Sequence, residues 1–398
     1  MRVVVVHGRY RSTAPSGENH VVDQESEALR AAGHKVHPFE RHSDDIAGWS
    51  LAAKAALPVR SIRNPGVRRD LARLLGRVRP DVVHVHNTFP LLSPSVLQAC
   101  SDAGVPVVAT FHNYKLLCAS GDFFRDERPC HDCASARGGP ALLHGCYRGS
   151  RLATAPVVLG NLANRDLWRR LVSAHVFISA AHRDLMAPLG LPHERVFVKH
   201  NFVPEPQVSL PRREHAVAYV GRLDAAKGVP LLMAAWDDLR HRFPATSLRL
   251  RVAGGGPLED DLRRWALDRP EVEVLGLLPR AEVTDVVARS LAVLVPSQWE
   301  ETFGLVAVEA MAAGVAPIAP AAGSFPELVT DGCDGVLVRP NSARDLADAI
   351  AAVEADPERV AAMGARGRRT YAERFTREVS TARLLDIYRF AVEHPVRP

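Results

Sequence analysis

Arg2-Val3-Val4-Val5-Val6-His7-Gly8 opens the chain, and an amphipathic period over Val21–Ala32, Gly33 and a β-rich run over Val36–Phe39 follow it. The valine run predicts a buried strand, and the amphipathic period predicts a helix that ends at the glycine. The second β-rich run predicts another strand. A strand, a helix and a strand in this order form a unit whose two strands are parallel. The beginning of the chain therefore predicts an α/β fold.

The same alternation continues to about residue 200. Further apolar, β-branched runs predict strands at Asp81–His86, Pro106–Phe111, His175–Ser179 and Arg195–Lys199. The segment 118–151 breaks the rhythm because it is rich in Gly, Arg and Cys, and we interpret it as an insertion or lid. We expect residues 1–203 to form a first Rossmann-like domain that carries this insertion.

Prolines and polar residues at 201–206 predict a linker, after which a second alternation begins. We expect a second doubly wound domain over 204–376, with ligands in the cleft between the two domains. Its expected strands are 216–220, 248–253, 272–275, 292–295, 316–319 and 335–338, and its expected helices include 229–242, 258–266, 281–290, 304–313 and 343–354. Helical sequence continues over 357–375 and 377–394, and we expect the C-terminal helix 377–398 to pack on the first domain.

The composition is that of an ordinary globular protein. Of the 398 residues 47% are hydrophobic and 24% are charged, and no apolar stretch reaches the roughly 20 residues that span a bilayer. The formal charge of +5 is spread along the chain without a basic run interleaved with aromatics, which disfavours nucleic-acid binding. The N-terminal apolar run is too short for a secretory leader and cysteines are few, so we expect a cytoplasmic protein.

Two glutamates with seven residues between them form the strongest chemical signal, in Glu301-Thr302-Phe303-Gly304-Leu305-Val306-Ala307-Val308-Glu309. Glu301 follows an expected strand and Gly304 begins an expected helix, whose first amides can bind an anion. Carboxylates also bond sugar hydroxyls. For two isolated glutamates, a surface loop acid and an exposed helix residue would be the ordinary interpretation.

A second signal is the loop Gly221-Arg222-Leu223-Asp224-Ala225-Ala226-Lys227-Gly228, which lies between an expected strand and an expected helix. The fork of Arg222 and the point charge of Lys227 suit the oxygens of a diphosphate. A solvated turn is the alternative for such a short motif. Its place at the same sheet edge as Glu301 favours a binding site.

These residues together resemble the retaining nucleotide-sugar glycosyltransferases of family four, which have the GT-B fold. The resemblance extends over nearly the whole chain and also includes Ala253-Gly254-Gly255-Gly256-Pro257, Pro296-Ser297, Ala313-Gly314 and Pro326-Glu327-Leu328. It implies two Rossmann-like domains that face each other across a cleft. It also implies transfer of a sugar from a nucleoside diphosphate, with UDP expected first and GDP next, to an acceptor hydroxyl.

The resemblance assigns roles to single residues. Glu301 lies near the donor sugar and Glu309 bonds the ribose, while Arg222 and Lys227 hold the diphosphate together with the turn of Phe303, Gly304 and Leu305. His112, at the end of an expected strand, corresponds to the histidine that contacts the donor sugar and acts in transfer. Gly17 resembles the N-terminal glycine of the family, although a plain turn capped by Ser16 or Asn19 is an equal alternative.

Four cysteines fall within the insertion, and two of them form a C-x2-C pair. They are Cys118, Cys130, Cys133 and Cys146. Four thiolates in a segment too poor in apolar residues to fold alone suggest a structural zinc ion, with His131 as a substitute ligand. Free thiols or a redox-sensitive pair are the alternative at equal odds. Cys100 and Cys333 are interpreted as ordinary thiols.

No clear nucleophile and no Asp-x-Asp metal triplet are evident, so we expect a metal-independent, same-face substitution without a catalytic cofactor. The acceptor stays open among small molecules, lipids and polysaccharides. Arginines at 60–79 could touch an anionic membrane, but a solvated helix face is favoured. A phosphorylase would need a pyridoxal-phosphate lysine, and lysines are scarce. A nucleotide-sugar sensor or scaffold without turnover is the alternative from another functional class.

Overall fold

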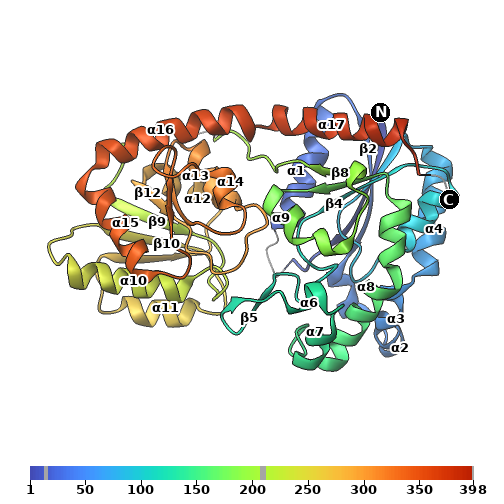
Figure 1. The fold of residues 1–398 in the computed structure, drawn as a ribbon, viewed down its shortest axis with the longest axis horizontal. Helices are drawn as coiled ribbons and strands as arrows, with labels where there is room; N and C mark the ends of the chain where they lie inside the picture. The colour runs from blue at the N-terminus through green and yellow to red at the C-terminus, as the bar shows by residue number, and fades with distance from the viewer. Residues whose placement is uncertain (13–16, 207–211, 397–398) are drawn as a thin grey trace. The chain divides into compact units, whose positions relative to one another are not determined.

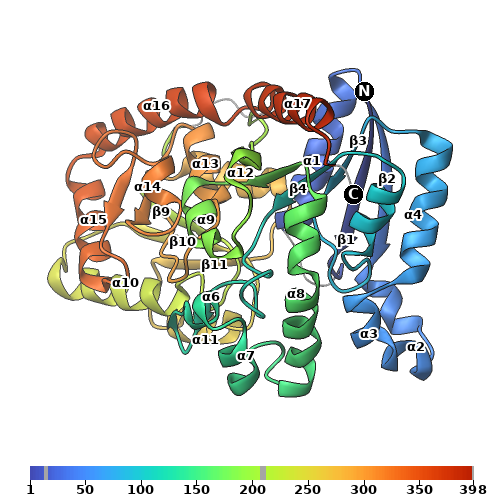
Figure 2. The same ribbon diagram turned by 45° about the vertical axis from the view of Figure 1, so that its right-hand side comes forward.

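The chain folds into two units in this computed structural model, which describes residues 1–12, 17–206 and 212–396. The first unit comprises residues 1–123 and 130–200 and the stretch from Ser380 onward, and the second comprises 124–129 and 201–379. Each unit has its own parallel six-stranded sheet covered by helices (Figures 1 and 2). The prediction of two doubly wound α/β domains is confirmed.

The first sheet has the strand order β2-β1-β3-β4-β7-β8. Its strands are β1 (Arg2–Arg9), β2 (Lys35–His42), β3 (Val82–Val85), β4 (Val107–Phe111), β7 (Ala174–Phe177) and β8 (Val196–Val198). Val3 pairs with both Val36 and Val82, which places the valine run inside the sheet. Strands buried on both faces explain why the sequence shows continuous apolar runs rather than alternation.

The helices of the first unit include several that the sequence analysis did not locate. They are α1 (Gly17–Ala31), α2 (Leu51–Ala55), α3 (Leu57–Ile62), α4 (Pro65–Val78), α5 (Ser95–Asp102), α8 (Arg151–Leu171), α9 (Ala180–Leu185) and α17 (Arg377–Glu393). Side chains of Ser50, Asn64, Ser150 and Ser179 cap the first turns of α2, α4, α8 and α9. Arginines of α4 pair with acids at the surface, as Arg68 does with Asp102 at 2.5 Å. This pairing agrees with the interpretation of these arginines as part of a solvated helix face.

The cysteine-containing segment is built of short elements outside the six-stranded sheets. It holds the two-stranded hairpin β5 (Phe124–Arg125) and β6 (Arg128–Pro129), and the helices α6 (Asp132–Ser135) and α7 (Gly139–His144). Cys133 and Ala141 pack against Val157 and Val158 of α8 in a small buried cluster. The segment therefore depends on α8 for its apolar contacts.

The second sheet has the order β11-β10-β9-β12-β13-β14. Its strands are β9 (Ala216–Val220), β10 (Arg249–Ala253), β11 (Val272–Gly276), β12 (Ala292–Leu294), β13 (Ala316–Pro320) and β14 (Val336–Val338). The helices are α10 (Val229–Arg242), α11 (Glu259–Ala266), α12 (Arg280–Arg289), α13 (Leu305–Ala312), α14 (Phe325–Leu328), α15 (Ala343–Ala355) and α16 (Pro357–Arg374). Helices α10 and α15 share one core cluster with the sheet, and α12 and α13 share another.

The last helix, α17, completes the core of the first unit. Leu384, Ile387, Tyr388 and Ala391 of α17 form one buried cluster with Val3, Val5, Val22 and Leu29. Figure 1 shows α17 along the first sheet beside α1. In the described part of the chain, no helix combines the length and the apolar character needed to cross a bilayer.

Candidate active site

The loop between β9 and α10 carries the two predicted diphosphate ligands. Arg222 is ion-paired with Asp224 at 2.5 Å, and a carboxylate oxygen of Asp224 accepts a hydrogen bond of 2.8 Å from the amide of Lys227. Gly228 ends the loop with φ of 78°, and a Cβ there would lie 1.8 Å from the carbonyl oxygen of Pro296. Only glycine fits this position. The loop is therefore pressed against the segment that leads to Glu301.

Glu301 is the buried partner of Lys227. The Lys227 ammonium forms a short ion pair with Oε1 of Glu301, and the hydroxyl of Ser297 donates to the same oxygen at 2.9 Å. Burial alone would raise the pKa of Glu301, but Lys227, Trp299 and Ser297 together lower it. A carboxylate with a cation at its side is thus held at the carboxyl edge of β9 and β12.

The turn that follows Glu301 leads into helix α13. Gly304 is the N-cap with φ of 81°, and a Cβ on it would lie 2.6 Å from the ring of Phe325. Leu305 is the first helical residue, so its amide is one of the donors that a helix start leaves for a ligand. Phe303 is buried with its ring 6.0 Å from that of Phe375, so its side chain belongs to the core.

Glu309 lies about one turn further along the same helix. Its carboxylate accepts a hydrogen bond of 3.2 Å from Arg280, and burial raises its pKa although Arg280 partly offsets the rise.

The glycine turn at 253–257 lies beside the loop at 221–228, since the amide of Leu223 donates to the carbonyl of Gly255 at 3.0 Å. The second unit therefore brings Lys227 and Glu301 into contact, with Arg222 in the loop of Lys227 and the start of α13 directly after Glu301 in sequence.

His112 lies in the first unit, directly after β4, and is bonded to a second histidine. Nδ1 of His86 and Nε2 of His112 are 2.9 Å apart, and the two rings stack with centroids 5.2 Å apart. Burial lowers the pKa of both rings well below the ordinary histidine value. Both imidazoles are therefore neutral. His86 thus lies in contact with the predicted catalytic histidine.

Behind His86 lies a buried charged network that the sequence analysis missed. Oε1 of Glu25 lies 3.2 Å from Nδ1 of His84 and 3.5 Å from Nε2 of His86, and Oε2 pairs with the ammonium of Lys199 at 2.8 Å. Burial would raise the pKa of Glu25, but Lys199 and His84 bring it below its ordinary value. The sequence signal for this network was an acidic residue, Glu25, among the apolar residues that α1 buries.

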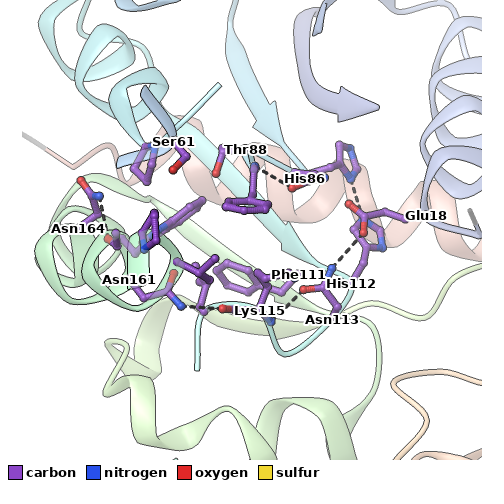
Figure 3. A pocket seen from close by; sticks show the side chains of 18 residues that line it. Glu18, Ser61, His86, Thr88, Phe111, His112, Asn113, Lys115, Asn161 and Asn164 are labelled. Carbon is purple, nitrogen blue, oxygen red and sulfur yellow. Dashed lines mark hydrogen bonds between the residues drawn. The ribbon is translucent and has the colours of Figure 1, made fainter. Parts of the chain in front are cut away.

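A small hollow of about 60 Å³ lies next to this histidine pair, within the first unit (Figure 3). His86, His112, Glu18 and Asn113 form one side of it, and residues of α3 and α8 form another. Its lining mixes aromatic and amide side chains, as small-ligand sites do. Glu18 accepts hydrogen bonds of 3.1 Å from Asn113 and from Tyr10, and burial raises its pKa to about 7.

The N-terminal glycine position is described only in part. Gly17 is the first residue of α1 and is exposed, directly before Glu18 of the hollow. Ser16, the alternative cap, lies outside the described residues. Nε2 of His7 is 2.9 Å from the side-chain oxygen of Asn19, which keeps Asn19 at the inner side of this turn. Gly17 thus lies at the same end of the sheet as His112. Its role in binding the donor stays a prediction.

None of the four cysteines of the insertion forms a disulfide bond. Burial, and after it the nearby thiols of Cys118, Cys146 and Cys130, raise the pKa of Cys133 to about 11, so these three thiols lie in the neighbourhood of Cys133. Among described residues, three metal-type ligand atoms lie within 4.8 Å of one another only at Glu25, His84 and His86. There the Lys199 ammonium already supplies a cation. The zinc site at the thiols stays a prediction.

Comparison with known protein families identifies the family of the chain. Residues 15–205 match the family described as Glycosyltransferase Family 4, and residues 205–370 match the one described as Glycosyl transferases group 1. The two matches meet close to the division between the units at residues 200 and 201. The chain belongs to glycosyltransferase family four and has the GT-B fold.

Relatives of this family-four glycosyltransferase match it to different extents. The phosphatidyl-myo-inositol mannosyltransferase of Mycolicibacterium smegmatis is 27% identical over 393 residues, covering 95% of this chain and 91% of the relative. The D-inositol 3-phosphate glycosyltransferase of Corynebacterium kroppenstedtii is 33% identical over 194 residues, or 47% of this chain. That match spans only 43% of the relative's length.

A solved structure shows the same fold. The crystal structure of Anabaena Alr3699/HepE in complex with UDP and glucose matches with a TM-score of 0.67 and 17% identity, covering 97% of this chain and 98% of that one. In the present family-four glycosyltransferase, the second unit offers two cations, free amides and a buried carboxylate at one sheet edge. The first unit offers two neutral imidazoles beside a polar hollow.

Proposed function

We propose that the protein is a retaining glycosyltransferase that moves a sugar from a nucleoside diphosphate, UDP before GDP, to an acceptor hydroxyl. The observation that supports this most is the ion pair of Lys227 with buried Glu301, which lies between Arg222 and the start of α13. Cations and amides suit a diphosphate, and the carboxylate suits sugar hydroxyls. Glu309, on the same helix, is suited to the two hydroxyls of a ribose.

The proposed reaction is a same-face substitution. The bond between the anomeric carbon and the β-phosphate oxygen breaks, and the acceptor oxygen forms a bond to the same face of that carbon. The acceptor proton passes to the departing β-phosphate, so no protein nucleophile is required. Arg222 and Lys227 stabilise the negative charge that develops on the leaving group. The neutral ring of His112 contributes a hydrogen bond at the sugar rather than a positive charge.

We further propose that turnover needs no metal ion. Arg222 and Lys227 supply two positive charges at one loop, which is the role that a divalent cation has in other nucleotide-sugar enzymes. Turnover should therefore persist in the presence of a chelator. Loss of turnover with chelator and its recovery with Mg²⁺ would contradict this part of the proposal.

The experiment that tests the donor is thermal stabilisation by UDP-, GDP-, ADP- and dTDP-sugars, each with and without chelator. A ligand at about 100 times its dissociation constant stabilises the folded protein by roughly 2.7 kcal/mol, which raises the melting temperature measurably. We expect one nucleotide family to stabilise the protein and Lys227→Ala to abolish that effect. If no nucleotide stabilises the protein, the diphosphate assignment fails.

A nucleotide-sugar sensor without turnover is the alternative that this panel alone does not separate. Release of the nucleoside diphosphate in the presence of candidate acceptors separates it, because a sensor binds the donor and releases nothing. The names of both relatives contain an inositol compound, so inositol phosphates and phosphatidylinositol are the first acceptors to test. Small sugars and polysaccharides follow. Six cysteines without a disulfide bond among them fit the reducing cytoplasm that we propose as its location.

A further inference from the structure

The last helix of the chain brings a tyrosine hydroxyl into the core of the first unit. Tyr388 of α17 is fully buried, and its hydroxyl lies 2.7 Å from Nδ1 of His84 in β3. The residues of α17 that share this core cluster are otherwise apolar, namely Leu384, Ile387 and Ala391. A buried hydroxyl is unfavourable unless it has a hydrogen-bond partner. Tyr388 and His84 therefore hold each other in place.

The ring of His84 is held at both of its nitrogens. Nε2 lies 2.7 Å from the hydroxyl oxygen of Thr110 in β4, on the other side of the ring from Tyr388. Burial lowers the pKa of His84 to about 4, so the ring is neutral. A neutral imidazole has one donor and one acceptor nitrogen, and a hydroxyl can serve either of them. The orientation of His84 is thus set jointly by the sheet and by the last helix.

His84 connects this contact to the histidine pair beside the hollow. His84 lies in β3 and His86 directly follows that strand, so the two side chains point to the same side of the sheet. Their ring centroids are 4.1 Å apart. His86 in turn lies 2.9 Å from Nε2 of His112. A displacement of His84 therefore reaches His112 through a single intervening ring.

A second side chain of α17 contacts the same buried network at its cation. The hydroxyl of Ser380 accepts a hydrogen bond of 3.1 Å from Lys199 and donates to the carbonyl of His200 at 2.9 Å. The ammonium of Lys199 pairs with Oε2 of Glu25, whose Oε1 faces His84 and His86. Figures 1 and 2 show α17 beside α1, the helix that carries Glu25. The last helix therefore contacts the network at two points, an imidazole and an ammonium.

We propose that Tyr388 is a positioning residue for glycosyl transfer, which keeps His112 in its reactive orientation through His84 and His86. This inference rests on the proposed function, because it assumes that His112 acts in the transfer. Tyr388 itself lies behind the site and touches no reacting atom. A side chain that acts in a reaction must be held close to its productive geometry by partners that are themselves fixed. A hydroxyl that served stability alone would leave the ring of His112 unchanged when it is removed.

Tyr388→Phe tests the proposal, because it removes the hydroxyl and keeps the aromatic ring in the core. We expect kcat to fall about 5- to 20-fold, while KM for the donor changes less than about twofold. The nitrogen-15 signals of the His112 ring should shift in this variant in the absence of substrate. Their loss in His112→Gln identifies them. In a protein that already carries His84→Asn, Tyr388→Phe should change kcat less than twofold, since both residues act through one contact.

Tyr371→Phe in the second unit is the matched control. Tyr371 is 2% exposed, and its hydroxyl donates to the carbonyl of Val203 at 2.9 Å. The control thus loses a comparable buried hydrogen bond, and it should leave kcat and the His112 signals unchanged. Unchanged His112 signals in Tyr388→Phe, or a loss of kcat no larger than in Tyr371→Phe, would overturn the proposal. If the original protein transfers no sugar, the proposed function fails, whereas the spectra still decide whether Tyr388 orients His112.

Discussion

Nε2 of His112 and Nδ1 of His86 share one proton across 2.9 Å. Because burial keeps both rings neutral, one of the facing nitrogens donates and the other accepts. The negative charge of Glu25, whose Oε1 lies 3.5 Å from Nε2 of His86 without a hydrogen bond to it, favours a proton on that nitrogen. We therefore expect Nδ1 of His86 to accept a hydrogen bond from His112 and to orient the ring of the predicted catalytic histidine.

Replacement of His86 tests this relationship. His86→Leu removes the acceptor for His112, and we expect turnover to fall about 10- to 100-fold because the ring loses its orientation. His86→Asn keeps a polar acceptor and should lose less. Nitrogen-15 spectra of labelled histidines report the tautomer of His112 directly and require no substrate. An unchanged His112 signal together with full turnover in His86→Leu would remove His86 from the site.

The buried ion pair of Glu25 with Lys199 should make the removal of either partner alone strongly destabilising. Glu25→Leu leaves a buried ammonium without its carboxylate, and we expect a loss of about 3–5 kcal/mol in the free energy of unfolding. The double variant Glu25→Leu/Lys199→Met should regain most of this. Urea unfolding measures both, with Arg263→Met, from an exposed pair on α11, as a control that loses no more than about 1 kcal/mol. Equal losses in the single and double variants would refute the pairing argument.

Lys227 and Glu301 should affect transfer far more than folding. Lys227→Ala and Glu301→Ala each remove a group that faces the developing charge or the sugar, and we expect turnover to fall about 100-fold or more. Because Lys227→Ala leaves the buried carboxylate of Glu301 without its cation, the melting temperature is measured beside the rate to show that the variant is folded at the assay temperature. Lys35→Ala, at an exposed lysine of β2, is the control. Near-normal rates in either site variant would exclude that residue from the mechanism.

Glu18 gives the stability of the protein a specific pH dependence. Its pKa rises from 4.5 to about 7 on folding, so the folded protein retains a proton that the unfolded chain has lost between these values. Stability from this group is therefore present below pH 4.5 and is lost as the pH rises to 7, by at most about 3 kcal/mol. Glu18→Gln should gain on the original protein between pH 5 and 8. The exposed Glu27→Gln, on the same helix, should show no such trend.

Metal analysis tests the cysteine segment. If Cys118, Cys130, Cys133 and Cys146 bind structural zinc, we expect about one zinc per chain and a lower melting temperature after chelation. Cys133→Ser should lose the metal because this thiol is near the other three. Cys333→Ser, at an exposed thiol, should retain it. Zinc-free protein after gentle purification would favour the free thiols.

The fold was predictable because its elements repeat a simple pattern. The expected strands and helices from residue 216 onward agree with the structure to within about two residues, since each is a short apolar run between glycine or proline turns. Helices α2, α3 and α8 escaped prediction. Their sequences mix exposed leucines with alanine and arginine, which blurs the contrast between a buried and a solvated face.

The site was predictable where chemistry depends on neighbours in sequence. Lys227 and Glu301 lie in the loops that follow the adjacent strands β9 and β12, and each loop could be identified separately from its own sequence. By contrast, Glu25 is 61 positions from His86 and 174 positions from Lys199. A contact between residues so far apart in the sequence leaves no local sequence pattern. Only the lone acid on the apolar face of α1 indicated that a partner was required.

The packing of α17 has a consequence for how the protein is made. The first unit receives Leu384, Ile387 and Tyr388 only from the final helix, although its own sheet is complete by residue 198. During synthesis on the ribosome, the apolar side chains of the first sheet that α17 covers therefore stay exposed until the second unit has been translated. The part of the protein that is translated first is thus finished last, and a chain shortened before residue 384 would expose the same face for its whole lifetime.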